Sequence, residues 1–162
     1  MLSALLQSNF QEAQAITRDP DAPAQFIAGW YYGIADKKER DDLSCFEADE
    51  DLTNTLYDAM EAYIVGDHSA GDAKMTATVP LYKEALSGCG RLETLIGNWA
   101  QKIDEMKERK DWPQISKQIY KANKDLIDRD TGLELREWEQ GVFFNSGMFA
   151  GQRGKVFLDN IP

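Results

Sequence analysis

The fold is set by residues 45–89, which read CFEADEDLTNTLYDAMEAYIVGDHSAGDAKMTATVPLYKEALSGC. Apolar side chains recur there every three to four residues, which is typical of an amphipathic helix over about 50–65. Gly66 stands where helices commonly end, because glycine adopts the left-handed conformation of that position without steric cost. Residues 69–72 (SAGD) have the pattern of a capping box and predict a second helix over about 69–86. The stretch is therefore predicted to be a helical hairpin.

Two cysteines flank this hairpin, Cys45 before its first helix and Cys89 after its second. Antiparallel helices of similar length bring their outer ends together, so the sequence favours a disulfide between the two. Such a bridge would contribute about 3–4 kcal/mol in the chain-entropy model. It would also indicate an extracellular or secretory-pathway protein. The alternative is a pair of buried free thiols, as in cytoplasmic proteins.

The rest of the chain, on both sides of the hairpin, is also predicted to be helical. Helical periodicity predicts helices over about 2–17, 23–38, 91–109, 113–127 and from 132 into the 150s. Asp130 is placed to cap the last of them. We find no alternation typical of strands and no internal repeat. The prediction is an all-α protein, a single-domain bundle of six to seven helices over residues 1–162, with a disulfide-stapled hairpin.

Charge excludes several classes of partner. The 162 residues carry 28 acidic and 18 basic side chains, a formal net charge of −10. That balance disfavours nucleic acid and anionic lipid surfaces, both of which select Lys and Arg. No stretch approaches the roughly 20 apolar residues that span a bilayer. The N-terminus does not have the pattern of a signal peptide, so we expect either a cytoplasmic protein or a mature chain whose leader has been removed.

Two pairs of glycines, each spaced by four residues, leave smooth strips on predicted helices: Gly29 with Gly33, and Gly147 with Gly151. Each helical glycine costs about 1 kcal/mol relative to alanine, so close helix packing is the expected compensation. We predict that the helix over 23–38 crosses the last helix at these strips. A crossing between two subunits is the alternative.

The C-terminal part is unusually apolar for a chain end. Residues 141–151 contain no charged side chain, and Phe149, Phe157 and Leu158 add large apolar groups in or beyond that segment. A helix that is apolar on all sides must be covered on all sides. Either this helix runs through the middle of the bundle, or a partner covers it, most simply another copy of the chain or another protein subunit.

Motifs that carry chemistry are few. The single histidine, His68, lies in a polar turn, and the zincin, zinc-ribbon and P-loop signatures are missing from the sequence. A weak calcium candidate places Asp128, Asp130 and Glu139 at loop positions 1, 3 and 12. Its glycine falls at position 5 instead of 6, and capping by Asp130 explains the same residues. We therefore predict no catalytic residue, no enzyme activity and no cofactor.

Four short segments combine glycines, cysteines and apolar residues: FIAGWYYGI (26–34), LSC (43–45), EALSGC (84–89) and GMFAG (147–151). Together they resemble an uncharacterised family of small secreted all-helical proteins from ciliate protists. The resemblance implies secretion and a bridge between Cys45 and Cys89, but it brings no activity. The tryptophan-rich second half and the lack of a visible leader depart from the pattern.

Two functions fit these observations. The first is a noncatalytic structural protein, a helical-bundle subunit that self-associates or joins a larger, extracellular assembly. The alternative is a helical carrier that binds a small apolar ligand in a cavity between helices. Phe26, Trp30, Tyr31 and Tyr32 would suit the wall of such a cavity, although core packing is their more ordinary role.

Overall fold

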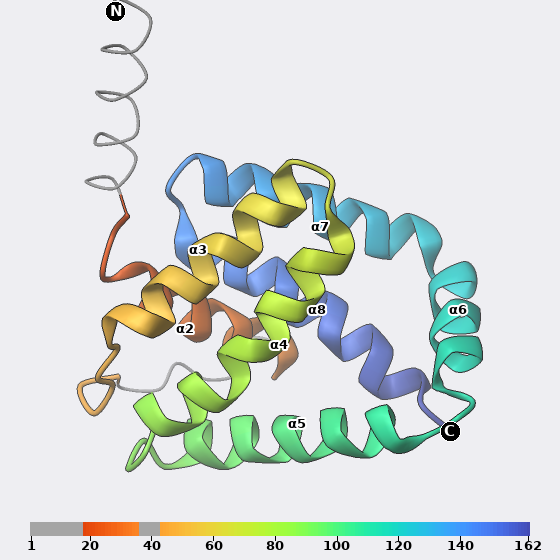
Figure 1. Ribbon diagram of the computed structural model, residues 1–162, viewed down its shortest axis with the longest axis horizontal. Coiled ribbons are helices and arrows are strands. Elements are labelled where there is room, and N and C mark those ends of the chain that lie inside the picture. Colours follow the sequence, from red (N-terminus) through yellow and green to blue (C-terminus); the bar gives the residue numbers. More distant parts are fainter. Residues whose placement is uncertain (1–17, 36–42) are drawn as a thin grey trace, which may run out of the picture.

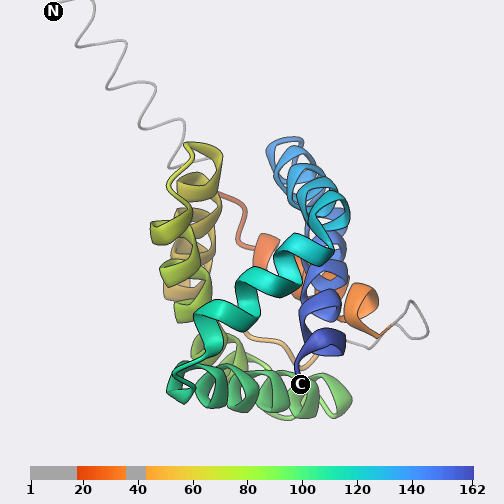
Figure 2. The same ribbon diagram turned by 90° about the vertical axis from the view of Figure 1, so that its right-hand side faces the viewer.

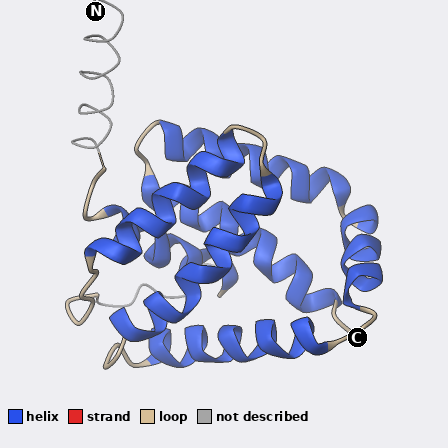
Figure 3. Ribbon diagram, in the orientation of Figure 1, coloured by secondary structure: helices blue, strands red, loops and turns tan. Residues whose placement is uncertain are grey.

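The computed structural model describes residues 18–35 and 43–162, and every regular element in those ranges is a helix (Figures 1 and 3). The helices are α2 (Ala22–Ile34), α3 (Glu50–Ile64), α4 (His68–Ala85), α5 (Arg91–Glu108), α6 (Trp112–Ala122), α7 (Lys124–Glu139) and α8 (Phe143–Asn160). The all-α prediction is confirmed. The helix predicted over 2–17 lies outside the described residues, as do residues 36–38 of the helix predicted over 23–38.

The helices form two walls above a common base. In Figure 2 the α3–α4 hairpin makes one wall and α7 with α8 makes the other, while α5 runs across the base and α6 climbs from α5 to α7. Helix α2 packs against α8. One hydrophobic core joins α2, α3, α4, α5, α7 and the start of α8, and its most completely buried apolar side chains are Leu52, Leu56, Met60, Leu86 and Leu92.

The turn of the hairpin has the predicted glycine. Gly66 has a φ of 87°, its N–H donates to the carbonyl of Tyr63, and the N–H of Asp67 donates to the carbonyl of Ala62. This pair of bonds is the Schellman arrangement that ends a helix. The predicted capping box at 69–72 is wrong. Helix α4 begins at His68, because the Asp67 carboxylate already accepts from the N–H of Ala70 at 3.1 Å.

The helix predicted to begin at 132 is also wrong, because it is two helices. Helix α7 spans Lys124–Glu139 and α8 begins at Phe143. Gly141 separates them with a φ of 75°, in the same hydrogen-bonding arrangement as at Gly66: its N–H donates to Trp138 and that of Val142 to Glu137. Asp130, predicted as a cap, lies inside α7. The helix predicted over 113–127 ends at Ala122.

Helices α2 and α8 cross at the predicted glycine strips, and the crossing lies within one chain. A Cβ atom at Gly29 would stand 1.8 Å from the carbonyl oxygen of Phe144, and one at Gly147 would stand 1.9 Å from that of Phe26. At Gly33 and Gly151 the corresponding distances to backbone oxygens are 2.2 and 2.3 Å. Real Cβ contacts are never so short, so the two backbones touch only because these four side chains are missing.

Replacing Gly29 or Gly147 with alanine should therefore force α2 and α8 apart. We expect each substitution to lower the free energy of unfolding by at least about 3 kcal/mol, measured by urea denaturation, because backbone instead of a flexible side chain must move. Gly97→Ala in α5 is the matched control, since nothing lies within 4 Å of its Cβ position. It should stabilise the protein by about 0.5–1 kcal/mol. Equal effects at the three positions would contradict the close crossing.

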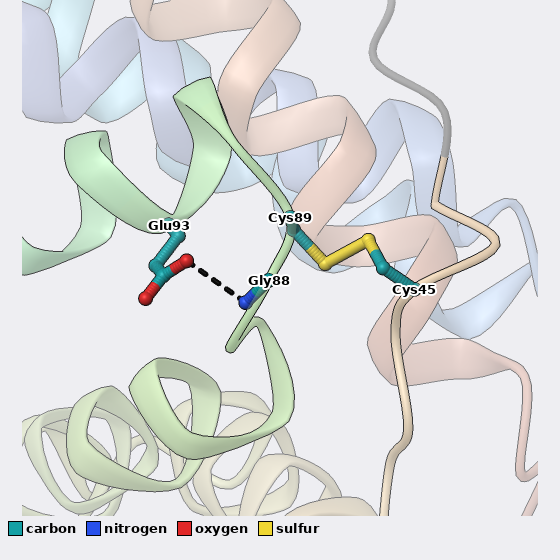
Figure 4. The surroundings of a disulfide bond; sticks show 4 residues. All are labelled: Cys45, Gly88, Cys89 and Glu93. Atoms are coloured by element: carbon teal, nitrogen blue, oxygen red, sulfur yellow. Dashed lines mark hydrogen bonds between the residues drawn. A yellow bond between two sulfur atoms is a disulfide. The ribbon is translucent and has the colours of Figure 1, made fainter.

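The outer ends of the hairpin are joined by a disulfide between Cys45 and Cys89, with a Cα–Cα distance of 5.6 Å (Figure 4). A backbone bond from Glu47 to the carbonyl of Ala85 lies beside it. The loop after α4 is fixed from the other side, where the Gly88 N–H donates to the Glu93 carboxylate at 2.8 Å. The bridge therefore ties the start of the hairpin to the junction between α4 and α5.

The double variant Cys45→Ala/Cys89→Ala should be less stable than the oxidised protein. The sequence separation of 44 residues corresponds to a loss of about 4 kcal/mol in the chain-entropy model. Urea denaturation with and without reductant measures it. Reductant should destabilise the natural chain by a similar amount and leave the double variant unchanged. If reductant does not change the stability of the natural chain, the bridge contributes nothing.

Candidate functional site

A cleft of about 390 Å³ lies between the two walls and above the base. Helix α4 lines one side of it and α8 the other, α5 forms its floor, and α2, α3 and α6 also contribute side chains. Its rings and other large apolar groups come from six different helices. The aromatic members are Phe26, Trp30, Tyr63, Tyr82, Trp99, Trp112 and Phe157.

Helix α5 shows how the sequence produces this floor. Its apolar stripe has helical spacing, and the first part of the stripe, Leu92 and Ile96, is almost fully buried in the core. The continuation of the same stripe, with Trp99 and Ile103, lines the cleft. The ring of Trp99 packs edge-on against that of Trp30 at a centroid distance of 5.6 Å, which fixes the floor against α2.

Few polar groups reach the apolar part of the cleft. The hydroxyl of Thr78 lines it, but that hydroxyl donates to the carbonyl of Met75 in its own helix at 2.6 Å. The hydroxyl of Tyr82 donates to the carbonyl of Pro23 at 2.8 Å. Both groups therefore satisfy backbone carbonyls and leave the wall largely apolar.

The charged side chains of the cleft are Asp72 from α4 and Arg153 from α8. Tyr63 donates its hydroxyl to the exposed Asp72 carboxylate at 2.6 Å. Burial raises the pKa of the Tyr63 hydroxyl, and the bond to Asp72 raises it further, so the phenol remains a donor at neutral pH. Asp72 was assigned to helix capping from the sequence, whereas in the structure it belongs to the cleft.

Arg153 is held by Glu134 of α7, a side chain that is only 1% exposed. One guanidinium nitrogen lies 2.6 Å from the Glu134 carboxylate and 3.1 Å from the hydroxyl of Thr131. Burial raises the pKa of Glu134, and Arg153 opposes that shift. Burial lowers the pKa of Arg153, but the neighbouring carboxylate outweighs it and the net shift is upward. Both groups are therefore held as an ion pair.

A second buried acid lies one turn before Glu134. Asp130 has no exposed surface, one of its oxygens lies 3.4 Å from the Arg129 guanidinium, and the other has no hydrogen-bond partner among the described residues. Burial raises the pKa of Asp130, while Arg129 and then Arg153 lower it. An unpaired buried oxygen costs free energy, so Asp130 makes α7 less stable than its packing alone would.

The calcium candidate is not a loop. Asp128, Asp130 and Glu139 all lie on the continuous helix α7, so they cannot wrap around an ion as the hypothesis requires. Asp128 instead accepts from the hydroxyl of Tyr120 at 2.7 Å and from Lys124 at 2.5 Å. Among the residues that the structure describes, no group of three His, Cys, Asp or Glu side chains could hold a metal ion.

The predicted C-terminal residues have different surroundings. Phe157 lines the cleft, Leu158 packs against the core, and Phe149 is half-buried. No residue from Phe143 to Leu158 is classed as exposed, so α8 is covered on most sides by its own chain. This agrees with the central helix that the sequence offered as one of two solutions. His68 is exposed at the first position of α4, beside the ring of Tyr63.

Sequence reasoning missed the polar end of the cleft and one of its tryptophans. Arg153 could have been found as the first cation after a long uncharged stretch, and Glu134 as an acid on the apolar face of α7. Trp112 lies between the helices predicted over 91–109 and 113–127. Its place in the cleft depends on how α6 packs, which the local sequence does not contain.

No known protein family, no curated protein and no solved structure matches this chain. In the described part of the chain, none of the helices combines the length and the apolar character needed to cross a membrane.

Arg153→Met should destabilise the protein strongly at neutral pH. It leaves the buried Glu134 carboxylate without its cation, which typically costs about 3–5 kcal/mol. Without Arg153, the pKa of Glu134 in the folded state rises further above its value in the unfolded chain, so the folded state binds more protons between the two values. Stability therefore falls as the pH rises through that window, and the loss is smaller in acid.

Urea denaturation across a range of pH measures this dependence. The double variant Glu134→Gln/Arg153→Met is the control, because it removes the stranded charge along with the cation. It should be more stable than Arg153→Met at neutral pH and should lack the additional pH dependence. A double variant that is no more stable than the single one would show that Arg153 acts through packing alone.

Proposed function

We propose that this protein is a noncatalytic carrier that binds a small, largely apolar molecule in the cleft between the two walls. The observation that carries this proposal is the cleft itself. Its volume of about 390 Å³ lies within the range of small-molecule sites, roughly 300–1,000 Å³. Its lining is aromatic and aliphatic with a few polar groups at one end, which is the usual composition of such sites.

The framework around the cleft supports binding without large rearrangement. The disulfide fixes the far end of α4, and the glycine crossing fixes α8 against α2. A site whose walls are already in place loses less conformational entropy when a ligand binds. The same disulfide supports our proposal that the protein functions in an oxidising compartment, either the secretory pathway or the extracellular space.

A structural role, by self-association or within a larger assembly, is the second candidate. One observation favours it: Val65 is 79% exposed and Ile64 is 40% exposed, side by side at the tip of the hairpin. Two apolar side chains make a small patch. The C-terminal segment, from which the assembly hypothesis came, is largely covered by its own chain. We therefore rank assembly below ligand binding.

Filling the cleft should abolish binding. We expect the neutral, environment-sensitive fluorophore N-phenyl-1-naphthylamine to bind the natural chain at one site, with increased emission. Val79→Trp places an indole in the cleft from α4 and should weaken binding at least about tenfold; Ile103→Trp does the same from the floor. Val65→Trp is the matched control, because Val65 lies on the exposed hairpin tip, and it should bind normally.

Circular dichroism verifies that each variant is folded. Equal binding by all three variants would place the fluorophore elsewhere and contradict the proposal. A stable oligomer in light scattering, together with no binding of the fluorophore, would favour the assembly function instead.

A further inference from the structure

We propose that the ligand is a cationic amphiphile, an apolar chain or ring system that carries an amine or ammonium group, and that Asp72 receives this group at the polar end of the cleft. This inference rests on the proposed carrier function and specifies the chemical class of its ligand. It follows from the charges that line the cleft, from their existing partners and from the rings beside them.

Only one of the two charged side chains of the cleft lacks a counter-ion. Arg153 is paired with Glu134 at 2.6 Å and also donates to Thr131. Asp72 accepts only the neutral hydroxyl of Tyr63, at 2.6 Å. Within the described residues, Asp72 forms no ion pair, so the uncompensated charge at this end of the cleft is negative.

An anionic ligand would meet an unfavourable field there. To reach Arg153 it would have to compete with Glu134, and the charge of Asp72 also acts on that guanidinium. Asp130 also interacts electrostatically with Arg153. The chain as a whole has a formal net charge of −10, which attracts cations and repels anions over longer distances.

The aromatic lining of the cleft also favours a cationic ligand. Tryptophan and tyrosine are among the rings that attract ammonium groups most strongly, and the attraction increases where water is excluded. Tyr63, which holds Asp72, lines the cleft together with Trp30, Trp99 and Trp112. A carboxylate beside such rings supplies the charge, and the rings supply a surface that both an ammonium group and an alkyl chain can cover.

The apolar part of the ligand has its place along α4. Asp72 lies near the start of this helix and Tyr82 near its end, and both line the cleft. Ten residues of helix correspond to about 15 Å. A ligand with its cationic group at Asp72 can therefore extend over Met75 and Val79 toward the apolar floor, which suits a chain of medium length.

Three probes with the same alkyl chain test the choice of head group: decylamine, decanol and decanoate, each used below the concentration at which it self-associates. Isothermal titration calorimetry and tryptophan fluorescence measure their affinities. We expect decylamine to bind about tenfold or more tightly than decanol, as for a hydrogen bond to a charged group, and decanoate to bind most weakly.

Asp72→Asn removes the charge but keeps an oxygen that can accept the Tyr63 hydroxyl. It should lower the affinity for decylamine about tenfold, to that of decanol, and change the affinity for decanol much less. The matched control is Asp104→Asn on α5, which changes the net charge equally at an exposed side chain outside the cleft. That variant should bind all three probes like the natural chain.

The outcomes separate this inference from the function on which it rests. Binding of all three probes with similar affinity, or a preference for decanoate, overturns the cationic class but leaves the carrier function intact. A preference for decylamine that survives Asp72→Asn overturns the role of Asp72. Binding of none of the probes, together with no binding of the neutral fluorophore, overturns the carrier function itself.

Discussion

Helices α2 and α8 lie backbone against backbone, because Gly29, Gly33, Gly147 and Gly151 leave no side chain between them. This contact determines where the rest of the molecule can go. It holds α8 deep enough that its other sides meet α7 and the cleft, and it brings α2 beneath the hairpin, where the Tyr82 hydroxyl donates to the carbonyl of Pro23. Four glycines within helices would by themselves lower the stability of those helices, so the close packing that they permit must compensate for this loss.

The cleft is a consequence of this arrangement. With α8 fixed on α2, the α7–α8 wall and the α3–α4 wall stand apart above α5, and α6 connects base to wall on one side only (Figure 2). The disulfide holds the hairpin at the junction of α4 and α5. The two walls are thus fixed at separate points by a close helix crossing and by a covalent bond, and the cleft lies between them.

Structure could be predicted from the sequence where the interactions are local, or where a residue type such as cysteine or helical glycine has one usual structural role. The helical hairpin, its Gly66 turn, the cysteine pair and the glycine crossing could all be predicted. Gly141 has the same turn geometry as Gly66, yet it escaped prediction because Leu135, Trp138 and Val142 keep the apolar spacing of a single helix across it. Trp112 escaped because its place in the cleft depends on helices distant in sequence. The pairing of Arg153 with Glu134 depends on how α8 packs on α7, which the spacing of residues does not contain.

Three of the four tryptophans show the difference between rings that are buried in the core and rings that line the cleft. Trp138 is 6% exposed and packs against Tyr57 and Phe143 at ring distances of 4.8 and 4.9 Å, so folding alone realises its hydrophobic contribution. Trp99 and Trp112 are only partly buried and line the cleft. Their remaining apolar surface contributes nothing to folding while it contacts water. A ligand that covers this surface would gain the hydrophobic free energy that folding does not realise there. That gain would account for large rings on the wall of an open cleft in a protein of modest size.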